Sequence, residues 1–373
     1  MTEYFPDKER LTFSGGVEAR TLFIAKHLAK TNKVSVLSSI QKGQKKVEKM
    51  FNFTVYRTGS VRTYQATAGD FLKRIAFILT AVNFGRKLDF EVIDGGNFIS
   101  HFIVKVISVI KKTVVVAWYP DVWVGEWFKN AGFAGISGEI LERLNLILGF
   151  DSFLAISKST FNKLIKAGVD KNKISLIPCG VSPEEFRGNI QKFQIKTIVC
   201  ISRLVAYKRI YDLIEAFSQI SNNNDNLQLI IVGTGPDEEK LKNLTKKLKV
   251  QKKVIFKKNL PRKQFVEIIK KSHLFCLPSA VEGFGITILE AAAAGVPYVV
   301  SNINVLRETT LNGQGGLFFK LGDISDLKDK IEVLLNDEKL YEEKVREGLD
   351  LAKGYDWKNI AEKTEKIYLQ LLN

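Results

Sequence analysis

Cysteine, histidine and methionine are scarce in this chain, with three, three and two residues among 373. The cysteines form no Cys-x-x-Cys pair, and Cys200 and Cys276 lie inside apolar runs, which is typical of buried free thiols in a reducing compartment. The histidines are far apart and have no cysteine or carboxylate at ligand spacing. We therefore expect neither a disulfide framework nor a structural zinc site.

Long apolar runs are also missing. The longest, residues 75–84 and 98–110, are shorter than the roughly 20 residues that cross a bilayer, and His101 and Lys105 interrupt the second. Residues 1–6 contain no apolar core of a signal peptide. These observations predict a cytoplasmic protein that at most touches the cytoplasmic face of a membrane as a peripheral protein.

Positive charge is in excess. Lys and Arg number 56 against 40 Asp and Glu, a formal net charge of +16, which indicates an anionic partner such as nucleic acid, an acidic membrane surface or a phosphate-bearing ligand. Residues 1–180 hold 26 basic and 15 acidic residues, whereas residues 181–373 hold 30 and 25, so most of the surplus lies in the first half. The 45% hydrophobic content excludes a disordered chain.

Short β-branched runs alternate with helical patterns, which predicts α/β domains with parallel sheets covered on both faces. Expected strands cover residues 34–39, 91–94, 113–117, 152–156, 174–178, 196–202, 227–232, 254–256, 273–277, 297–301 and 316–319. Expected helices cover residues 17–31, 70–88, 211–220, 237–248, 262–271, 285–294, 324–336 and 357–371.

The stretch 178–194 breaks this alternation and predicts a domain boundary. We expect two Rossmann-like doubly wound domains facing a central cleft, one over 1–180 and one over 181–355. A last helix over 356–373 is expected to pack back on the first domain. A doubly wound domain normally begins with an apolar strand before its first glycine loop, so we expect a truncated first strand with its tail at residues 2–5.

Two segments have the composition of phosphate-binding loops. Gly15 and Gly16 follow Ser14 and open a helix, where glycine permits close approach and helix N–H groups attract phosphate, although a plain turn explains them equally well. Arg203 and Lys208 follow an expected strand, at the edge where α/β sheets bind ligands, and can converge on one diphosphate. A solvated loop is the alternative for this pair.

Two further loops follow expected strands. Gly233 and Gly235 lack the third glycine and the partner acid of a dinucleotide fingerprint, which favours a tight strand-to-helix turn. Glu282 lies in a glycine-flanked loop and Glu290 in a short apolar helix, where a carboxylate is costly to bury unless it is hydrogen-bonded. Hydroxyls of a ribose or hexose would satisfy Glu290, and an ion pair to a nearby Arg or a backbone contact is the alternative.

The run Glu282-Gly-Phe-Gly-x-x-x-x-Glu290-Ala-x-Ala-x-Gly-x-Pro297, with seven residues between its acids, resembles the signature of the retaining GT-B glycosyltransferases of group 1. That family includes sucrose synthases and phosphatidylinositol mannosyltransferases. The Gly15-Gly16 loop, the Ile177–Val181 hinge, the Arg203/Lys208 pair, Gly233-x-Gly235-Pro and Gly315-Gly316 occur in the family's order. The similarity extends over essentially the whole chain and is specific in the carboxyl half. It implies that the domain over 1–180 binds the acceptor and that the domain over 181–355 binds the nucleotide sugar.

The resemblance implies a hexosyltransferase that moves a sugar from a UDP- or GDP-sugar to a hydroxyl of a glycan, lipid-linked or small-molecule acceptor, with retention of configuration and without a metal or other cofactor. It assigns Glu290 to the donor ribose, Glu282 to the transferred sugar, and Arg203 with Lys208 to the diphosphate. Further donor contacts are implied at Gly15, Gly16, Gly233, Leu260, Phe284, Gly285, Ile286 and Thr287.

One run departs from the family pattern. Relatives often carry a histidine in a His-Asp-x-Trp-like run, where this chain has Pro120, Asp121 and Trp123. Proline supplies no side-chain hydrogen bond, so Asp121 is our candidate for the missing catalytic group, with Tyr119 as its rival. A structural aromatic loop remains open as the alternative.

Other functions compete with sugar transfer. A nucleotide-sugar epimerase or hydrolase would use the same fold, and a basic nucleic-acid-binding protein would explain the charge. Against nucleic acid, the aromatics are not interleaved with a basic stripe and no known binding module is present. The segment 70–87 is apolar with basic ends, which is typical of a helix on an anionic membrane surface and equally of a core helix with solvated ends.

Overall fold

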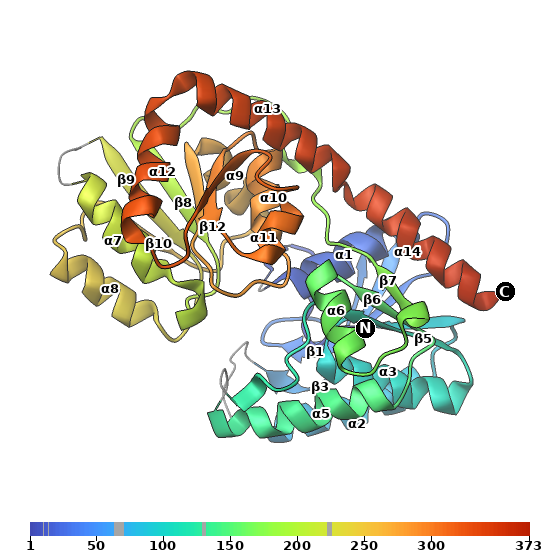
Figure 1. The fold of residues 1–373 in the computed structure, drawn as a ribbon. Coiled ribbons are helices and arrows are strands. Elements are labelled where there is room, and N and C mark those ends of the chain that lie inside the picture. The colour runs from blue at the N-terminus through green and yellow to red at the C-terminus, as the bar shows by residue number, and fades with distance from the viewer. Residues whose placement is uncertain (10, 14, 63–70, 129–131, 222–225) are drawn as a thin grey trace. The chain divides into compact units, whose positions relative to one another are not determined.

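The computed structural model describes residues 1–9, 11–13, 15–62, 71–128, 132–221 and 226–373. Contacts divide the chain into two compact units (Figure 1): unit 1 comprises residues 1–179 with 357–373, and unit 2 comprises residues 180–356. Each unit has its own sheets, helices and apolar core. Ser14 and Asp70, which fall in the first glycine loop and in the expected helix over 70–88, lie outside the described residues.

Unit 1 contains two sheets. The first has four parallel strands in the order β4 (Val92–Gly95), β5 (Val114–Tyr119), β6 (Ser152–Ala155) and β7 (Ile174–Leu176). The second has the order β1 (Ser35–Gln41), β3 (Phe53–Arg62) and β2 (Val47–Met50), in which β1 runs parallel to β3 and β2 runs antiparallel to it.

Residues 1–3 lie between these two sheets and hydrogen-bond to both. On one side, the N–H of Thr2 donates to the carbonyl of Leu37 in β1 at 3.2 Å. On the other side, the N–H of Gly96, just after β4, donates to the carbonyl of Met1 at 2.9 Å. The first residues of the chain therefore link the two sheets of unit 1, as a strand between them would.

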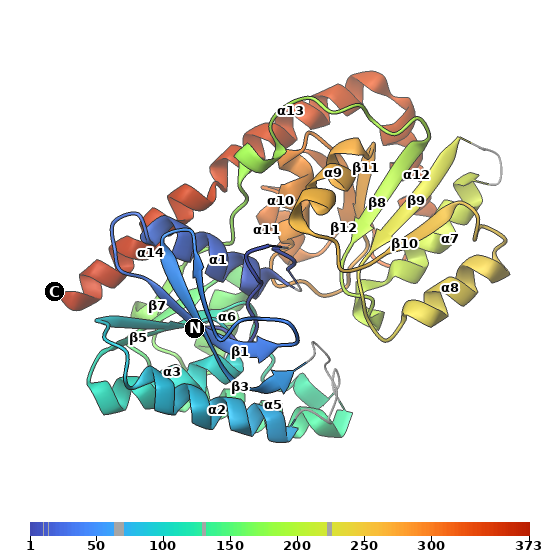
Figure 2. The same cartoon turned by 180° about the vertical axis from the view of Figure 1, so that it is seen from behind.

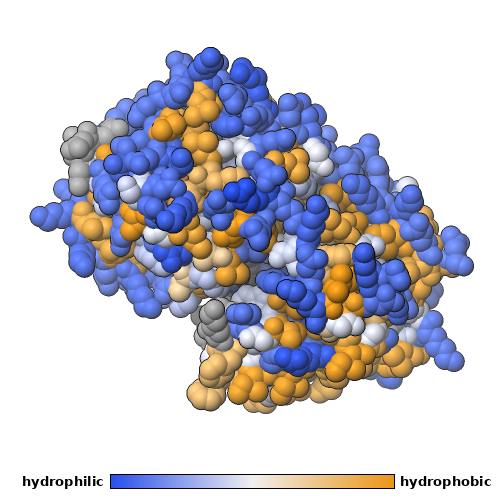
Figure 3. All heavy atoms as spheres, viewed as in Figure 1, coloured by the Kyte–Doolittle hydropathy of each residue, from blue (hydrophilic) through white to orange (hydrophobic). Residues whose placement is uncertain are grey.

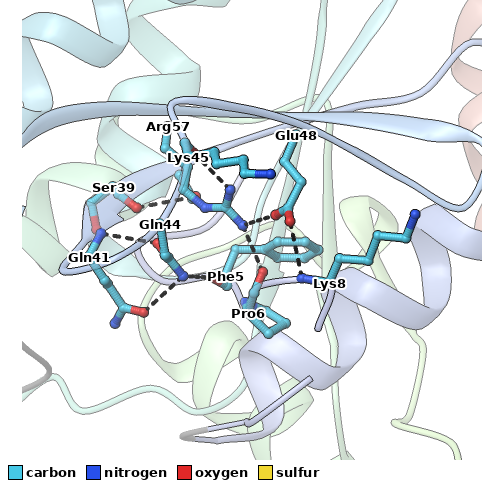
Figure 4. Close-up of polar contacts among 10 residues, drawn as sticks. Phe5, Pro6, Lys8, Ser39, Gln41, Gln44, Lys45, Glu48 and Arg57 are labelled. Carbon is cyan, nitrogen blue, oxygen red and sulfur yellow. Dashed lines mark hydrogen bonds and ion pairs between the residues drawn. The ribbon is translucent and has the colours of Figure 1, made fainter. Parts of the chain in front are cut away.

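Arg57 of β3 fixes the segment that follows these residues (Figure 4). Its guanidinium donates to the carbonyls of Lys45 at 3.0 Å and Pro6 at 2.8 Å and pairs with Glu48 at 2.9 Å. The guanidinium is buried, and a buried charge needs such partners to offset its lost hydration.

Helices cover both faces of unit 1. They are α1 (Gly16–Leu28), α2 (Phe71–Gly85), α3 (Phe98–Lys111), α5 (Gly135–Ile147), α6 (Lys158–Lys166) and α14 (Trp357–Leu372). Figures 1 and 2 show α2, α3 and α5 along one side of the sheets, with α3 in contact with both neighbours. Helix α3 begins at a capping box, because Asn97 accepts from the N–H of Ser100 and the Ser100 hydroxyl accepts from the N–H of Asn97.

The last helix, α14, packs against α1. The rings of Phe23 and Trp357 stack with centroids 5.4 Å apart, and both side chains are buried. Near the other end of α14, the Tyr368 hydroxyl donates to the carboxylate of Asp94, which also pairs with Arg20 at 2.7 Å. These contacts tie the chain's last helix to unit 1.

Unit 2 is built on one parallel six-stranded sheet. Its order is β10 (Val254–Lys257), β9 (Leu227–Val232), β8 (Lys196–Ile201), β11 (Leu274–Leu277), β12 (Tyr298–Ser301) and β13 (Gly316–Phe319). Its helices are α7 (Ile210–Ser221), α8 (Glu238–Lys247), α9 (Arg262–Lys271), α10 (Ile286–Ala293), α11 (Asn304–Thr309), α12 (Ile324–Asn336) and α13 (Glu338–Gly354). The central strands are buried, as their continuous apolar runs predict.

The sequence located the strands of unit 2 within two residues but missed β2 and β3 of unit 1. These two strands carry Glu48, Lys49, Arg57 and Gly59, so they lack the apolar run by which the other strands were recognised. The antiparallel β2 also departs from the expected all-parallel sheets. The apolar run 98–110 forms α3, and within the described residues no helix has the length and apolarity needed to cross a membrane.

Candidate functional site

The candidate donor site lies at the carboxyl edge of the sheet in unit 2. Strand β8 pairs with β9 on one side and with β11 on the other, and all three run parallel. Their carboxyl ends therefore meet at one edge, which is where open α/β sheets bind ligands. The loops that leave this edge begin at Ser202, Gly233 and Pro278, and together with helix α10 (Ile286–Ala293) they carry most of the expected donor-binding residues.

The two glycines after β9 are required by the contact between loops. A Cβ on Gly233 would lie 1.9 Å from the carbonyl oxygen of Ser202, and one on Gly235 would lie 2.2 Å from that of Leu204. Between them, the N–H of Leu204 donates to the carbonyl of Thr234 at 2.9 Å. This packing accounts for both glycines as parts of a tight turn, and the donor contact at Gly233 stays a prediction.

Lys208 and Glu282, which are 74 residues apart in the chain, meet in this site. Lys208 ends the short helix η5 (Ala206–Lys208), and its ammonium lies 2.5 Å from Oε1 of Glu282. Both side chains are about nine-tenths buried. The two loops are also joined through their backbones, because the N–H of Ala280 donates to the carbonyl of Tyr207 at 2.8 Å.

Arg203 lies at the exposed rim of the same loop. Its guanidinium donates to the hydroxyl of Tyr207 at 2.5 Å, and the ring of Tyr207 lies within 6 Å of the charged groups of both Arg203 and Lys208. Sequence reasoning did not single out Tyr207. The sequence did contain a signal for it. Tyr207 lies four residues after Arg203 and one before Lys208, and cations bind to aromatic faces.

Helix α10 supplies backbone donors at this edge. Gly285 precedes it with φ of 92°, in the left-handed region that favours glycine, and a Cβ there would crowd Ile288 and Leu306 at 3.0 Å. The N–H groups of Ile286 and Thr287 are in the first turn, where helices lack internal acceptors and carry partial positive charge. The side chain of Phe284 is buried and serves packing. Its backbone carbonyl accepts a hydrogen bond from the hydroxyl of Thr309.

Glu290 is buried in α10 and is paired with an arginine. Its Oε1 accepts from Nη1 of Arg262 at 2.5 Å, while Nε and Nη2 of Arg262 donate to Glu185 at 3.1 Å and 2.6 Å. Burial raises the pKa of Glu290, and the two carboxylates raise the pKa of Arg262 although burial opposes its charge. Glu290 thus forms the ion pair with an arginine that was the alternative to a sugar contact. Leu260, the other expected donor contact in this region, is half-buried after β10 and lies two residues before Arg262.

Asp121 lies in unit 1, two residues after the end of β5. Its carboxylate accepts from the N–H of Val122 at 2.8 Å, from the indole of Trp123 at 3.0 Å and from Lys163 at 2.6 Å. With these three hydrogen bonds, the carboxylate of Asp121 holds the aromatic loop, residues 118–123, in place. The catalytic assignment of Asp121 stays a prediction.

The rival candidate, Tyr119, is unsuited to acid–base chemistry. Its side chain is 1% exposed, and burial raises the pKa of its hydroxyl far above the ordinary value. The ring centroids of His101, in α3, and Tyr119 lie 4.4 Å apart, and Nε2 of His101 lies 2.9 Å from the carbonyl oxygen of Trp118, to which it hydrogen-bonds. Burial lowers the pKa of His101 to about 4, so this imidazole is neutral at physiological pH.

Glu142 of α5 holds the other end of the aromatic loop. Its carboxylate accepts from the backbone N–H of Trp123 and, at 2.6 Å, from the indole of Trp127. Burial raises the pKa of Glu142 to about 7, which makes it the titrating group of this loop.

A pH dependence follows from this shift. Because the folded-state pKa of Glu142 lies above its ordinary value of 4.5, the folded state binds more protons, and its contribution to stability falls as pH rises from about 4.5 through 7. Replacing Glu142 with Gln is expected to remove this part of the pH dependence in urea unfolding monitored between pH 5 and 8. Asp89→Asn, which removes an exposed acidic residue of unit 1, is the control, and an unchanged pH dependence in Glu142→Gln would contradict the assignment.

Gly15 and Gly16 begin α1 in unit 1. Gly15 is exposed with extended backbone, and a Cβ on it would meet nothing within 4 Å inside the described structure. The fold itself therefore does not demand glycine at position 15, in contrast to positions 233 and 235. A role in close approach to a ligand stays a prediction for both residues.

Two further features bear on ligands. Among the described residues, no group of three or more His, Cys, Asp or Glu side chains is arranged to hold a metal ion. A surface hollow of about 550 Å³ in unit 2 is lined by Phe193, Gln228 and Lys271 among others. It lies at the amino ends of β8 and β9, away from the edge that carries the expected donor-binding residues.

Comparisons with known proteins agree with this arrangement. Residues 182–349 match the family model described as glycosyl transferases group 1, and residues 14–185 match glycosyltransferase family 4. The glycogen synthase of Mycobacterium tuberculosis is 30% identical over 173 residues, which are 46% of this chain and 42% of that protein. The phosphatidyl-myo-inositol mannosyltransferase of Mycobacterium leprae is 30% identical over 157 residues, 42% of this chain and 41% of that protein.

The chain thus spans about half the length of the curated relatives it matches. Among solved structures, Anabaena HepE in complex with UDP and glucose superposes with a TM-score of 0.76 at 16% identity, over 98% of each chain. At that identity the likeness concerns the fold. The two family matches together run from residue 14 to residue 349, with the group 1 match following the family 4 match, and the chain has the fold of the GT-B glycosyltransferases.

Proposed function

We propose that this chain is a retaining hexosyltransferase that moves a sugar from a UDP- or GDP-sugar to a hydroxyl acceptor in glycan or glycolipid biosynthesis. The observation that carries the proposal is the buried Lys208–Glu282 pair at the edge where β8 and β11 end. The names of the relatives, a glycogen synthase and a lipid mannosyltransferase, and the UDP and glucose bound to HepE support it.

The chemistry of sugar transfer fits these residues. Breaking the bond between the anomeric carbon and the diphosphate oxygen places negative charge on the leaving diphosphate. Lys208, Arg203 and the first N–H groups of α10 would stabilise that charge. In this role they would take the place of a metal ion. We propose that the acceptor hydroxyl attacks from the face that the diphosphate leaves, and its proton passes to the departing oxygen, without a covalent intermediate on the protein.

A donor screen tests the proposal. The chain is incubated with UDP- and GDP-hexoses, with and without acceptor alcohols, and released UDP or GDP is measured. We expect release that depends on the acceptor, persists in EDTA and yields a product of unchanged anomeric configuration by NMR. Release without an acceptor would favour a hydrolase, a new nucleotide sugar would favour an epimerase, and thermal stabilisation by an oligonucleotide alone would favour a nucleic-acid-binding protein.

The acceptor side of the proposal concerns the helices α2 and α5. Helix α2 is partly a core helix and partly a surface helix. Phe77 is fully buried, whereas Leu72 and Leu79 are 78% and 65% exposed. On α5, a stripe at helical spacing is exposed, made of Ile136, Ile140, Leu144 and Ile147. Figure 3 shows hydrophobic side chains gathered over this part of unit 1.

We propose that this apolar face rests on an anionic membrane surface, which would bring a lipid-linked acceptor to unit 1. Lys73 is exposed beside the apolar residues and suits anionic lipid headgroups. Arg74 is not equivalent to it, because its guanidinium lies 3.4 Å from the buried Glu3. A charge reversal at Arg74 would therefore disturb the fold as well as the surface.

Vesicle binding tests the membrane face. Replacing both Leu79 and Ile140 with Glu is expected to lower partitioning onto phosphatidylglycerol vesicles by about tenfold or more, because each change removes apolar area and adds a repelled charge. Leu369→Glu, at an exposed position of α14, is the matched control. No binding of the unaltered chain to such vesicles at low salt would contradict the proposal.

A further inference from the structure

One side chain connects three elements of unit 2 beneath the candidate donor site. Arg262, the first residue of α9, donates with one edge of its guanidinium to Glu185 and with Nη1 to Glu290. Glu185 lies in the short helix η4 (Pro183–Phe186), and Glu290 lies in α10. The guanidinium is about nine-tenths buried, and the rings of Phe186 and Phe265 lie 5.7 Å and 4.9 Å from it.

The geometry divides the Glu290 carboxylate into two oxygens with different roles. Oε1 is bound to Arg262 at 2.5 Å, and among the described residues no donor reaches Oε2. A carboxylate oxygen has two lone pairs, so Oε2 keeps its capacity to accept hydrogen bonds from hydroxyl groups. The ion pair thus fixes the orientation of the carboxylate without using up its acceptors.

The charges in this cluster also matter. Arg262 carries one positive charge and contacts two carboxylates, so the three side chains together retain a net negative charge. If Glu290 stood alone, its burial would favour the protonated form, which presents a donor in place of an acceptor. Arg262 favours the ionised form of Glu290, whereas the negative charge of Glu185 opposes it and keeps the cluster from being neutralised.

We propose that Arg262 is a positioning residue that orients Glu290 and keeps it charged, so that its second oxygen binds the ribose hydroxyls of the nucleotide. Glu185 in turn holds the opposite edge of the guanidinium. The inference rests on the proposed function, because it assumes that Glu290 faces a ribose. It goes further in naming two residues, outside the Glu-x7-Glu run, on which discrimination of ribose would depend.

The test compares nucleotides that differ at one hydroxyl. Binding of UDP and 2′-deoxy-UDP, and of GDP and 2′-deoxy-GDP, is measured by calorimetry with the full chain. In the unaltered chain we expect the ribonucleotide that binds to do so about tenfold more tightly than its deoxy analogue, as for a hydrogen bond to a charged group. In Arg262→Gln this ratio is expected to fall toward one, whereas general weakening of the fold would lower both affinities equally.

Conservative variants keep the outcome decisive. Arg262→Lys preserves the charge but not the fork, and it is expected to retain part of the ratio even if Arg262→Gln fails to fold. Glu185→Gln is expected to reduce the ratio, whereas Glu184→Gln, its exposed neighbour, should leave it unchanged. An undiminished ratio in the folded Arg262 variants would overturn the inference alone. No binding or no discrimination by the unaltered chain would overturn the ribose site itself, and the inference with it.

Discussion

Replacing Lys208 with alanine is expected to lower the kcat of sugar transfer by about 10³-fold, because it removes a preorganised cation from the leaving diphosphate. The ammonium is about nine-tenths buried and lies in a site where electrostatic stabilisation is less screened than in water. The measurement is acceptor-dependent release of UDP or GDP at saturating donor. Lys242→Ala, which removes an ion-paired lysine from the surface of α8, is the control and should leave kcat unchanged.

The same variant has a structural cost that must be separated from catalysis. Removing one partner of a buried pair leaves Glu282 uncompensated, which typically destabilises a fold by about 3–5 kcal/mol. The double variant Lys208→Met with Glu282→Gln has neither charge and is expected to recover most of this stability. If it recovered activity as well, or if Lys208→Ala kept full activity, the role assigned to Lys208 would be wrong.

The candidate donor site could be predicted in part because its residues follow apolar strands. Parallel strands that are buried on both faces are recognised by their continuous apolar runs, and their carboxyl ends mark the binding edge. The pairing of Lys208 with Glu282 could not be predicted in the same way. It depends on β11 lying next to β8, although β9 and β10 intervene in the chain, and strand order is not encoded in local pattern.

Residues that support the site from below were missed for a related reason. Glu185 and Arg262 belong to no recognisable motif, and they contact each other only because η4 packs beside α9. The two glycines after β9 were recognised, but their physical cause, the carbonyls of Ser202 and Leu204, became visible only in three dimensions. Motifs therefore located the groups expected to touch the ligand, whereas the groups that hold them needed the fold.

In unit 1 the limit was the local composition. The strand β3 carries Arg57 and Arg62, which pair with Glu48 and with the buried Glu3, so charged residues occupy positions where an apolar pattern was sought. The aromatic loop after β5 was recognised by its departure from the family pattern. Two carboxylates accept hydrogen bonds from indoles here: Asp121 from Trp123 and Glu142 from Trp127. The role of Glu142 was not predicted, because this residue comes from α5.

Replacing Glu290 with alanine is expected to lower kcat/KM for the nucleotide-sugar donor by about 10²-fold or more, mainly through a higher KM. The variant removes the acceptor for ribose hydroxyls, each worth a factor of about ten or more at a charged group. It also leaves Arg262, buried in the same site, with Glu185 as its remaining carboxylate partner among the described residues. Binding of UDP or GDP should weaken in parallel with the rise in KM.

Glu290→Gln separates the loss of charge from the loss of shape. Glutamine keeps the volume and one carbonyl acceptor, so we expect a fold close to that of the unaltered chain and an intermediate KM. Glu239→Ala, a 78% exposed glutamate of α8, serves as the control for removing an acidic residue from unit 2. Should the Glu290→Ala variant fold normally and keep its donor KM, Glu290 would be a structural partner of Arg262 alone, and the ribose would have to bind elsewhere along the carboxyl edge of the sheet.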